Sequence, residues 1–197
     1  MLTQVQQNQW LFKADIWRIF STCFSYPENE AIANIQQFGK ELQPHSNIIP
    51  ETLPLFRFLQ RASLHSTLET EYSQLFIQGN IPLSETAYHP SIDIYSELSA
   101  FYQAFGVQPI SGDAPDTLAY ELEFLGVLCV KVALSQNTEQ REIAFSAYLE
   151  FVRNHLVPMV EKLHKRLSET FPEAIYTQLT EYLLNLLRNE NRALSLN

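Results

Sequence analysis

The stretch SGDAPDTLAYELEFLGVLCVKVAL, residues 111–134, decides the fold of this chain. When its residues are placed about 100° apart, as in an α-helix, one stripe is wholly apolar and other apolar side chains fill much of the remaining circumference. This pattern predicts a central helix that its neighbours nearly surround. Its entry offers Ser111, Asp113 and Asp116 as candidate caps, and Pro115 suits a first helical turn. The apolar stripe consists of Leu118, Leu122, Leu125, Cys129 and Val132.

One charged side chain lies at the edge of this stripe. Glu121 falls about 60° from Leu118 on the helical projection. A carboxylate in such a position loses its hydration, which is unfavourable unless another group hydrogen-bonds to it. We therefore expect Glu121 to be partly buried and to have a partner.

Length and composition indicate one all-α domain. The chain has 197 residues, 46% of them hydrophobic and only five of them glycine. This length suits one substantial core, and alternating β-branched runs are nearly lacking, whereas Leu, Glu, Gln and Ala recur at helical spacing. We expect a single domain over 1–197 with about nine to ten helices around the central one. Residues 1–8 and 189–197 are expected to fray.

Helical periodicity and proline positions predict where the other elements lie. A loop over 78–91 contains Gly79, Pro82 and Pro90 and is longer than most connections in helical domains, as functional loops often are. Gly106 can take a left-handed conformation after a helix. The expected helices cover 9–24, 28–42, a segment from 53, then 67–77, 95–105, 139–154, a segment restarting near 155, and 173–188.

Charge and cysteine usage limit the possible partners and compartments. The net charge is −9, with 22 acidic and 13 basic residues and no basic block, so we expect no nucleic-acid partner and favour a basic one. Cys23 and Cys129 lack CxxC spacing and are expected to be small buried hydrophobes in a reducing compartment. No basic leader and no apolar run of about 20 residues occurs. These features predict a cytoplasmic, soluble protein without stable membrane insertion.

The sequence contains little that points to catalysis, a metal or a cofactor. Only Glu161-x-x-His164 fits a Glu-x-x-His pair, whereas a di-metal bundle needs two such pairs and further carboxylates. Phosphate-binding glycine motifs are lacking, and no histidine belongs to a recognisable nucleophile motif. His155 is read as a hydrogen-bonding residue at a helix junction. A helical enzyme using Glu121 and His155 remains a hypothesis that requires both side chains in one pocket.

Five motifs occur in a characteristic order along residues 10–187, roughly. They are Phe24-x-Tyr26-Pro27, Glu71-Tyr72-x-x-Leu75-Phe76, Phe101-Tyr102 with Phe105-Gly106, Pro115-Asp116-Thr117-Leu118-x-x-Glu121-Leu122, and Phe151-x-x-x-His155-Leu156-x-Pro158. In these motifs and their order the chain resembles the TorD-like family of redox-enzyme maturation chaperones. Two places depart from the family pattern: Thr117 stands where a histidine is usual, and Val157 with Met159 where a tryptophan is common.

The resemblance implies an all-helical, non-enzymatic chaperone without a cofactor. Its partners would be the twin-arginine leader and the apo form of a molybdopterin-containing oxidoreductase, which it would hold back from export until the cofactor is inserted. Such a leader carries two guanidinium groups and an apolar, helix-forming segment, so its receptor needs carboxylates beside an aromatic groove. The expected groove lies between the 78–91 loop and the start of the central helix. The candidate peptide-binding residues are Asp116 and Glu121 for the charges and Tyr72, Leu75, Phe76 and Tyr88 for the apolar segment.

Other roles for these residues stay open on the sequence alone. Asp116 is equally suited to cap a helix, Glu121 to form a structural hydrogen bond, and Leu75 and Phe76 to pack in the core. An alternative function is a helical scaffold or regulatory protein that binds a folded partner through exposed aromatic residues. The chain could be a monomer or a domain-swapped dimer.

Overall fold

The described part of the chain is helical throughout its regular elements. The computed structural model describes residues 2–61, 64–79, 81–89, 93–108 and 114–194, and within these ranges no β-strand occurs. The α-helices are α1 (Gln4–Phe24), α2 (Asn29–Leu42), α3 (Leu53–Leu59), α4 (Leu64–Tyr72), α5 (Ile94–Ala104), α6 (Leu118–Leu134), α7 (Thr138–Phe151), α8 (Val157–Thr170) and α9 (Ile175–Leu194). The all-α prediction is therefore confirmed. Since α7 and α8 run on through a π-turn, the separate helices are slightly fewer than the nine to ten expected.

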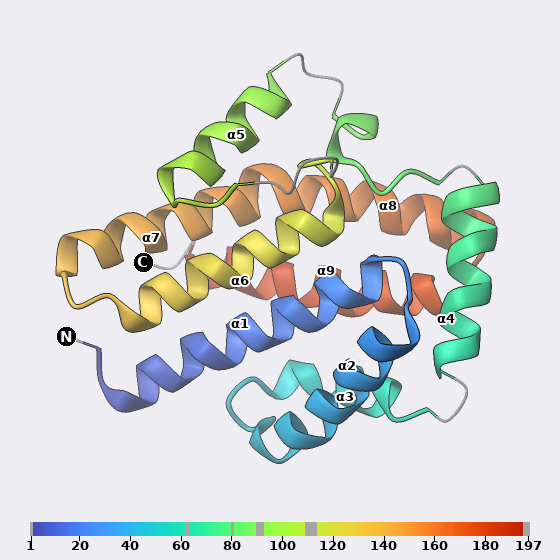
Figure 1. The fold of residues 1–197 in the computed structure, drawn as a ribbon, viewed down its shortest axis with the longest axis horizontal. Coiled ribbons are helices and arrows are strands. Elements are labelled where there is room, and N and C mark those ends of the chain that lie inside the picture. The colour runs from blue at the N-terminus through green and yellow to red at the C-terminus, as the bar shows by residue number, and fades with distance from the viewer. Residues whose placement is uncertain (1, 62–63, 80, 90–92, 109–113, 195–197) are drawn as a thin grey trace.

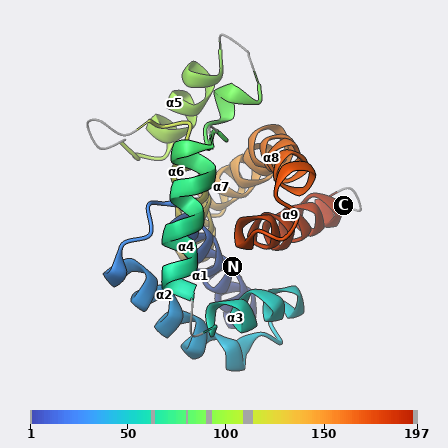
Figure 2. The ribbon, with the colours of Figure 1, turned by 90° about the vertical axis from the view of Figure 1, so that its right-hand side faces the viewer.

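Helix α6 occupies the centre of the molecule, as its sequence predicts. Figure 1 shows it between α1 and α7, with α5 above it and α9 behind. Ten of its 17 residues are buried, and they pack against α1 most extensively. Gly126 allows this close approach, because a Cβ at that position would lie 3.4 Å from the carbonyl oxygen of Ala14 on α1. The end-on view in Figure 2 shows α8 beside α9 on one side of the molecule and α2 with α3 at the bottom.

Both ends of the chain are more helical than expected. Helix α1 begins at Gln4 rather than near residue 9, because Thr3 and Gln6 form a reciprocal capping box. The Thr3 hydroxyl accepts from the Gln6 amide at 3.2 Å, and the Gln6 side chain accepts from the Thr3 amide at 2.9 Å. At the other end α9 continues to Leu194. Residues 1 and 195–197, also within the ends expected to fray, lie outside the described residues.

Two π-turns explain why two predicted helix boundaries differ from the structure. The helix expected over 67–77 is α4 followed by the π-turn η3 (Ser73–Gln78). The helix expected to restart near residue 155 does not stop at all, because the π-turn η5 (Val152–Leu156) joins α7 to α8. Pro158 lies just after η5 and lacks an amide hydrogen, and its ring would clash with a regular helical carbonyl at Asn154. The wider π-turn accommodates the proline without breaking the helix.

The segments around α5 and α6 show which turn predictions were right. Gly106 follows α5 with φ of 70°, as expected for a left-handed helix end. Helix α6 begins later than expected, with Thr117 at its N-cap and no side-chain capping bond. Pro115 and Asp116 therefore precede the helix instead of forming its first turn and cap. The other two candidate caps, Ser111 and Asp113, lie outside the described residues.

The cysteines and the hydropathy of the helices agree with the sequence analysis. Cys23 and Cys129 are both free and fully buried. Across the described ranges, none of the helices combines the length and the apolar character needed to span a membrane.

The packing of α6 on α1 can be tested at Gly126. A Gly126→Ala substitution adds a methyl group at ordinary van der Waals distance and favours the helix by up to about 1 kcal/mol, so we expect unchanged or slightly raised stability. Gly126→Leu overfills the same contact and should lower the free energy of unfolding by about 1–3 kcal/mol. Urea denaturation of both variants measures the difference. Equal stability of the two would contradict the close contact.

Candidate functional site

The predicted loop is fixed to the start of α6 by backbone hydrogen bonds. The Glu85 amide donates to the carbonyl of Asp116, and the Leu118 amide donates to the carbonyl of Leu83, both at 2.8 Å. Ser84 and Thr117 form an antiparallel bridge between these bonds. A 3₁₀-turn, η4 (Glu85–Ala87), follows at once. The loop and the entry of the central helix are thus one local structure, as the sequence analysis expected.

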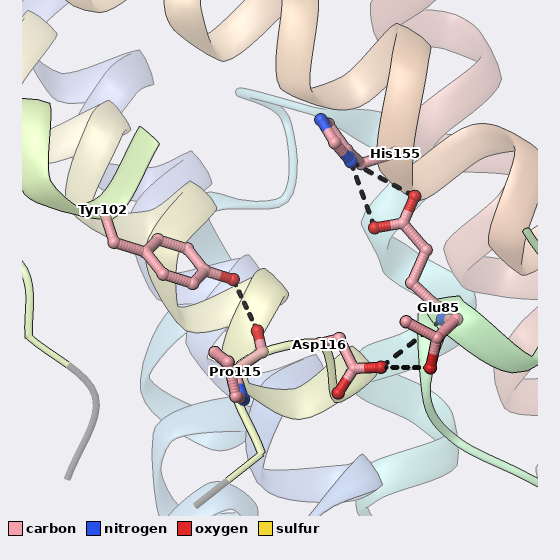
Figure 3. Close-up of polar contacts among 6 residues, drawn as sticks. Glu85, Tyr102, Pro115, Asp116 and His155 are labelled. Atoms are coloured by element: carbon pink, nitrogen blue, oxygen red, sulfur yellow. Dashed lines mark hydrogen bonds and ion pairs between the residues drawn. The ribbon is translucent and has the colours of Figure 1, made fainter. Parts of the chain in front are cut away.

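The carboxylate of Asp116 holds this junction from the side. Its Oδ2 accepts from the Thr86 hydroxyl at 2.6 Å and from the Thr86 amide at 3.4 Å, and its Oδ1 accepts from the Tyr95 hydroxyl at 3.2 Å. Tyr102 adds a bond at 2.7 Å to the carbonyl of Pro115 (Figure 3). Asp116 is 1% exposed. In this arrangement it connects two segments and presents no free oxygen to a ligand.

Glu85 reaches from the same loop into the core and meets His155. Figure 3 shows the two side chains pointing toward each other, with Nδ1 of His155 3.1 Å and 3.0 Å from the two Glu85 oxygens. An ionised carboxylate only accepts hydrogen bonds, so Nδ1 carries the hydrogen. The Glu85 side chain is fully buried and that of His155 nearly so. The prediction that His155 is a hydrogen-bonding residue at a helix junction is confirmed.

Aromatic rings fix the orientation of His155. The imidazole stacks on Phe151 with centroids 5.0 Å apart and meets Phe101 of α5 edge-on at 5.6 Å. The π-turn η5 carries His155 at this position, so the helix irregularity coincides with the buried polar contact. Residues in π-turns are often found at functional sites.

Glu121 completes the group and is fully buried, as the sequence analysis expected in part. Burial raises the pKa of its carboxyl well above the ordinary value of 4.5, and the neighbouring Glu85 and Asp116 carboxylates raise this pKa further. Neither Glu121 oxygen has a donor among the described residues. A neutral Glu121 carboxyl resolves this, because its own O–H donates to Glu85. Glu85 is thus the partner that Glu121 was expected to have.

Together these residues form a closed polar cluster, which we call the Glu85 cluster: Glu85, Asp116, Glu121 and His155. All four are 3% exposed or less. The enzyme hypothesis required Glu121 and His155 in one pocket. The structure places both beside Glu85, in the buried interior. The cluster is buried away from solvent, so its role is structural: its polar contacts join the loop, α6 and η5. Glu85 was not expected from the sequence, because nothing in a polar loop marks one glutamate as buried.

The expected apolar contact residues form a second feature at the end of α4. Tyr72 packs edge-on against Phe76 at 5.1 Å and against Tyr26 at 5.7 Å. Phe76 and Tyr72 also meet Tyr176 of α9. Leu75 is 3% exposed and belongs to the core, whereas Tyr72 and Phe76 are half-buried.

A hollow of about 270 Å³ lies beside Tyr72, between the end of α1, the loop and the start of α6. This position is where the sequence analysis expected a groove. Its exposed carboxylate is Glu123, two residues after Glu121 and therefore on nearly the opposite face of α6. Sequence reasoning missed Glu123, although its place outside the apolar stripe is the signal that could have found it. Asp116 and Glu121, the expected charge-binding residues, do not line this hollow.

Tyr88 contacts α8 and does not line the hollow beside Tyr72. Its hydroxyl donates to the Pro82 carbonyl at 2.9 Å, and Lys162 of α8 donates to its carbonyl at 2.7 Å. Burial raises the pKa of Tyr88 to about 12. The ring is half-buried, so part of it remains available to a partner.

Both members of the single Glu-x-x-His pair have partners on α9. Glu161 accepts from Arg188 at 2.8 Å, and Nδ1 of His164 lies 3.1 Å from the Thr180 hydroxyl. Throughout the described ranges, no group of His, Cys, Asp and Glu side chains is arranged to hold a metal ion.

The neutral state of Glu121 gives a testable pH dependence. In the unfolded chain Glu121 ionises above about pH 4.5, whereas the folded chain keeps its proton, so the stability from this group is full below pH 4.5 and falls as the pH rises. The loss is up to about 1.4 kcal/mol per pH unit until the folded pKa is reached. Glu121→Gln removes this titration and keeps a hydrogen-bond donor. Between pH 5 and 8 we therefore expect the free energy of unfolding of the variant to rise relative to wild type in urea titrations, and parallel curves would contradict a buried neutral carboxyl.

Comparisons with known proteins identify the family of this chain. The sequence model of the family described as nitrate reductase delta subunit matches residues 35–165. A selenate reductase assembly chaperone protein from Thauera selenatis is 28% identical over 165 residues, which cover 79% of this chain and 75% of that protein. No solved structure matches the chain at a significant level. The match covers most of the chain, so the protein belongs to the nitrate reductase delta subunit family, a TorD-like family of redox-enzyme maturation chaperones rather than enzymes.

Proposed function

We propose that this chain is an assembly chaperone for a molybdopterin-containing oxidoreductase. It binds the twin-arginine leader and the apo form of the catalytic subunit, assists cofactor insertion and delays export until insertion is complete. Family membership carries this proposal, and a relative whose name is selenate reductase assembly chaperone supports it. We place this activity in the cytoplasm, where the apoenzyme and its leader are made.

The charge of the chain is suited to such a client. A net charge of −9 favours encounter with a segment that carries two guanidinium groups, particularly at low ionic strength. The activity is binding without turnover.

The six expected contact residues divide into surface and interior groups, and we assign them different roles. Tyr72, Phe76 and Tyr88 are half-buried and expose ring edges, so they contact the apoenzyme. The side chains of the other three are buried, so they support this surface without touching the partner: Leu75, Asp116 and Glu121. Half-exposed aromatic rings with one wet edge are frequent anchors in protein interfaces.

Leader binding is tested by calorimetric titration of the purified chain with synthetic twin-arginine leaders of molybdoenzymes. Each leader is paired with a version in which both arginines are replaced by alanine. We expect saturable binding of one leader with a dissociation constant at or below about 1 μM, and at least tenfold weaker binding of its alanine version. The leader that binds identifies the client. Absence of binding to every leader would contradict this function and favour a scaffold that recognises a folded partner.

Two substitutions test whether the Tyr72 hollow contacts the apoenzyme. Tyr72→Ala removes the aromatic ring, and Glu123→Lys reverses an exposed charge at the same hollow without disturbing the core. We expect each to weaken binding of the apo catalytic subunit by roughly 5- to 50-fold, because central aromatic truncations in interfaces cost about 1–2 kcal/mol or more. Phe171→Ala, which removes an exposed ring at the α8–α9 turn, is the matched control. Surface plasmon resonance on immobilised apo subunit measures all three. Wild-type affinity in both hollow variants would exclude this surface.

A further inference from the structure

A groove runs along the surface between α5 and α7, remote from the Tyr72 hollow. It has a volume of about 680 Å³, within the range of about 300–1,000 Å³ typical of ligand sites. Figure 1 shows α5 lying above α6 and α7, so the groove follows the line where α5 meets α7. We call it the α5–α7 groove.

The floor of the α5–α7 groove is apolar. On α5 it is made by Phe101 and Phe105 with two small residues, Ala100 and Ala104, and on α7 by Ile143 and Ala147. Phe101 packs edge-on against Phe151 of α7, with ring centroids 5.3 Å apart. Ile143 is 55% exposed, which is unusual for an isoleucine flanked by other apolar side chains. A neighbouring hollow toward the end of α6 shares Phe105 and Ile143 and adds Leu134, together with the cationic Lys131.

The rim of the same groove is acidic. It carries Glu97 from α5 and Glu139, Glu142 and Glu150 from α7, all exposed. Among the residues that the structure describes, none of these four carboxylates forms an ion pair with a lysine or arginine. Four uncompensated negative charges around an apolar floor form a surface that attracts cations.

The arrangement follows from helical spacing on both sides. On α5 the groove residues recur as i, i+3, i+4, i+7 and i+8 from Glu97, which is one continuous stripe. On α7 the three glutamates alternate with Ile143, Ser146 and Ala147 along one face. Such a stripe on a surface helix normally packs against another helix. Here the two stripes leave space for a further helix, and no described part of the chain fills it.

We infer that the α5–α7 groove binds the cationic, apolar leader of the client as a helix. This inference rests on the proposed function and adds the location of the leader. The apolar segment of the leader lies on the floor, and its arginines pair with the rim glutamates. Helix-in-groove recognition of this kind combines apolar anchors at i, i+3 and i+4 with charges at the edge.

Charge complementarity favours this groove over the other candidates on the surface. Asp116 and Glu121 are buried, and Glu121 is neutral, so neither can pair with a guanidinium group in this structure. The Tyr72 hollow is smaller and has one exposed carboxylate, Glu123. Two neighbouring guanidinium groups bind most strongly where each can pair with an accessible carboxylate, and the α5–α7 groove has four.

The experiment is titration of a fluorescently labelled twin-arginine leader into variants with equal charge changes. The test variant is Glu142→Gln with Glu150→Gln. The control is Glu69→Gln with Glu181→Gln, two exposed positions on α4 and α9. We expect the test variant to bind the leader about 5- to 30-fold more weakly and to show a shallower dependence on salt, since it has lost two ion pairs. The control should bind within about twofold of wild type.

Ile143→Gln tests the floor independently of charge. The side chain is largely exposed, so the fold should be unaffected, and we expect about 3- to 10-fold weaker binding of the leader. If wild type distinguishes the leader from its alanine version while both groove variants bind like wild type, the α5–α7 groove is excluded and the proposed function stands. If wild type binds no leader, the proposed function and this inference both fail.

Discussion

The Glu85 carboxylate is the interaction on which the loop, the central helix and the α7–α8 helix jointly depend. An ionised carboxylate in an apolar core is unfavourable by several kcal/mol unless hydrogen bonds replace its water. Here the replacements come from His155 on η5 and Glu121 on α6, so three segments distant in sequence must be in place together. The Asp116 contacts with Thr86 and Tyr95 add a fourth, α5. The fold around the loop is therefore determined by polar contacts and not by apolar packing alone.

This arrangement separates the rigid part of the chaperone from its contact surfaces. The polar residues that the family motifs carry, Asp116, Glu121 and His155, lie inside and hold the loop in one conformation. The surfaces suited to a partner lie outside: half-buried aromatic rings near Tyr72, and an apolar groove with an acidic rim. Rigid support lowers the entropic penalty of binding, since fewer groups are ordered when the partner arrives.

Much of the fold could be predicted from local patterns, and the exceptions have physical causes. The buried central helix, the left-handed Gly106 and the burial of Glu121 follow from helical periodicity and glycine chemistry. The continuity of α7 with α8 could not be predicted, because a proline normally ends a helix and a π-turn has no simple sequence pattern. The site was harder to predict. Asp116 and Glu121 were expected to contact the leader, but the structure buries both. Their orientation depends on partners distant in the sequence: Thr86 and Tyr95 for Asp116, and Glu85 for Glu121. Likewise the α5–α7 groove exists only because two helical stripes come to lie side by side.

The π-turn η5 allows one continuous helix to pack against different neighbours before and after the turn. A π-turn contains one residue more than a regular helical turn, and each residue of an α-helix advances by about 100°. The extra residue therefore rotates the faces of α8 relative to those of α7. Helix α7 faces α6 and the α5–α7 groove, while α8 turns its apolar side toward α9. One inserted residue thus turns the apolar face of the helix toward a different neighbour. The two parts of the protein are separated by this rotation, while the helix backbone stays continuous.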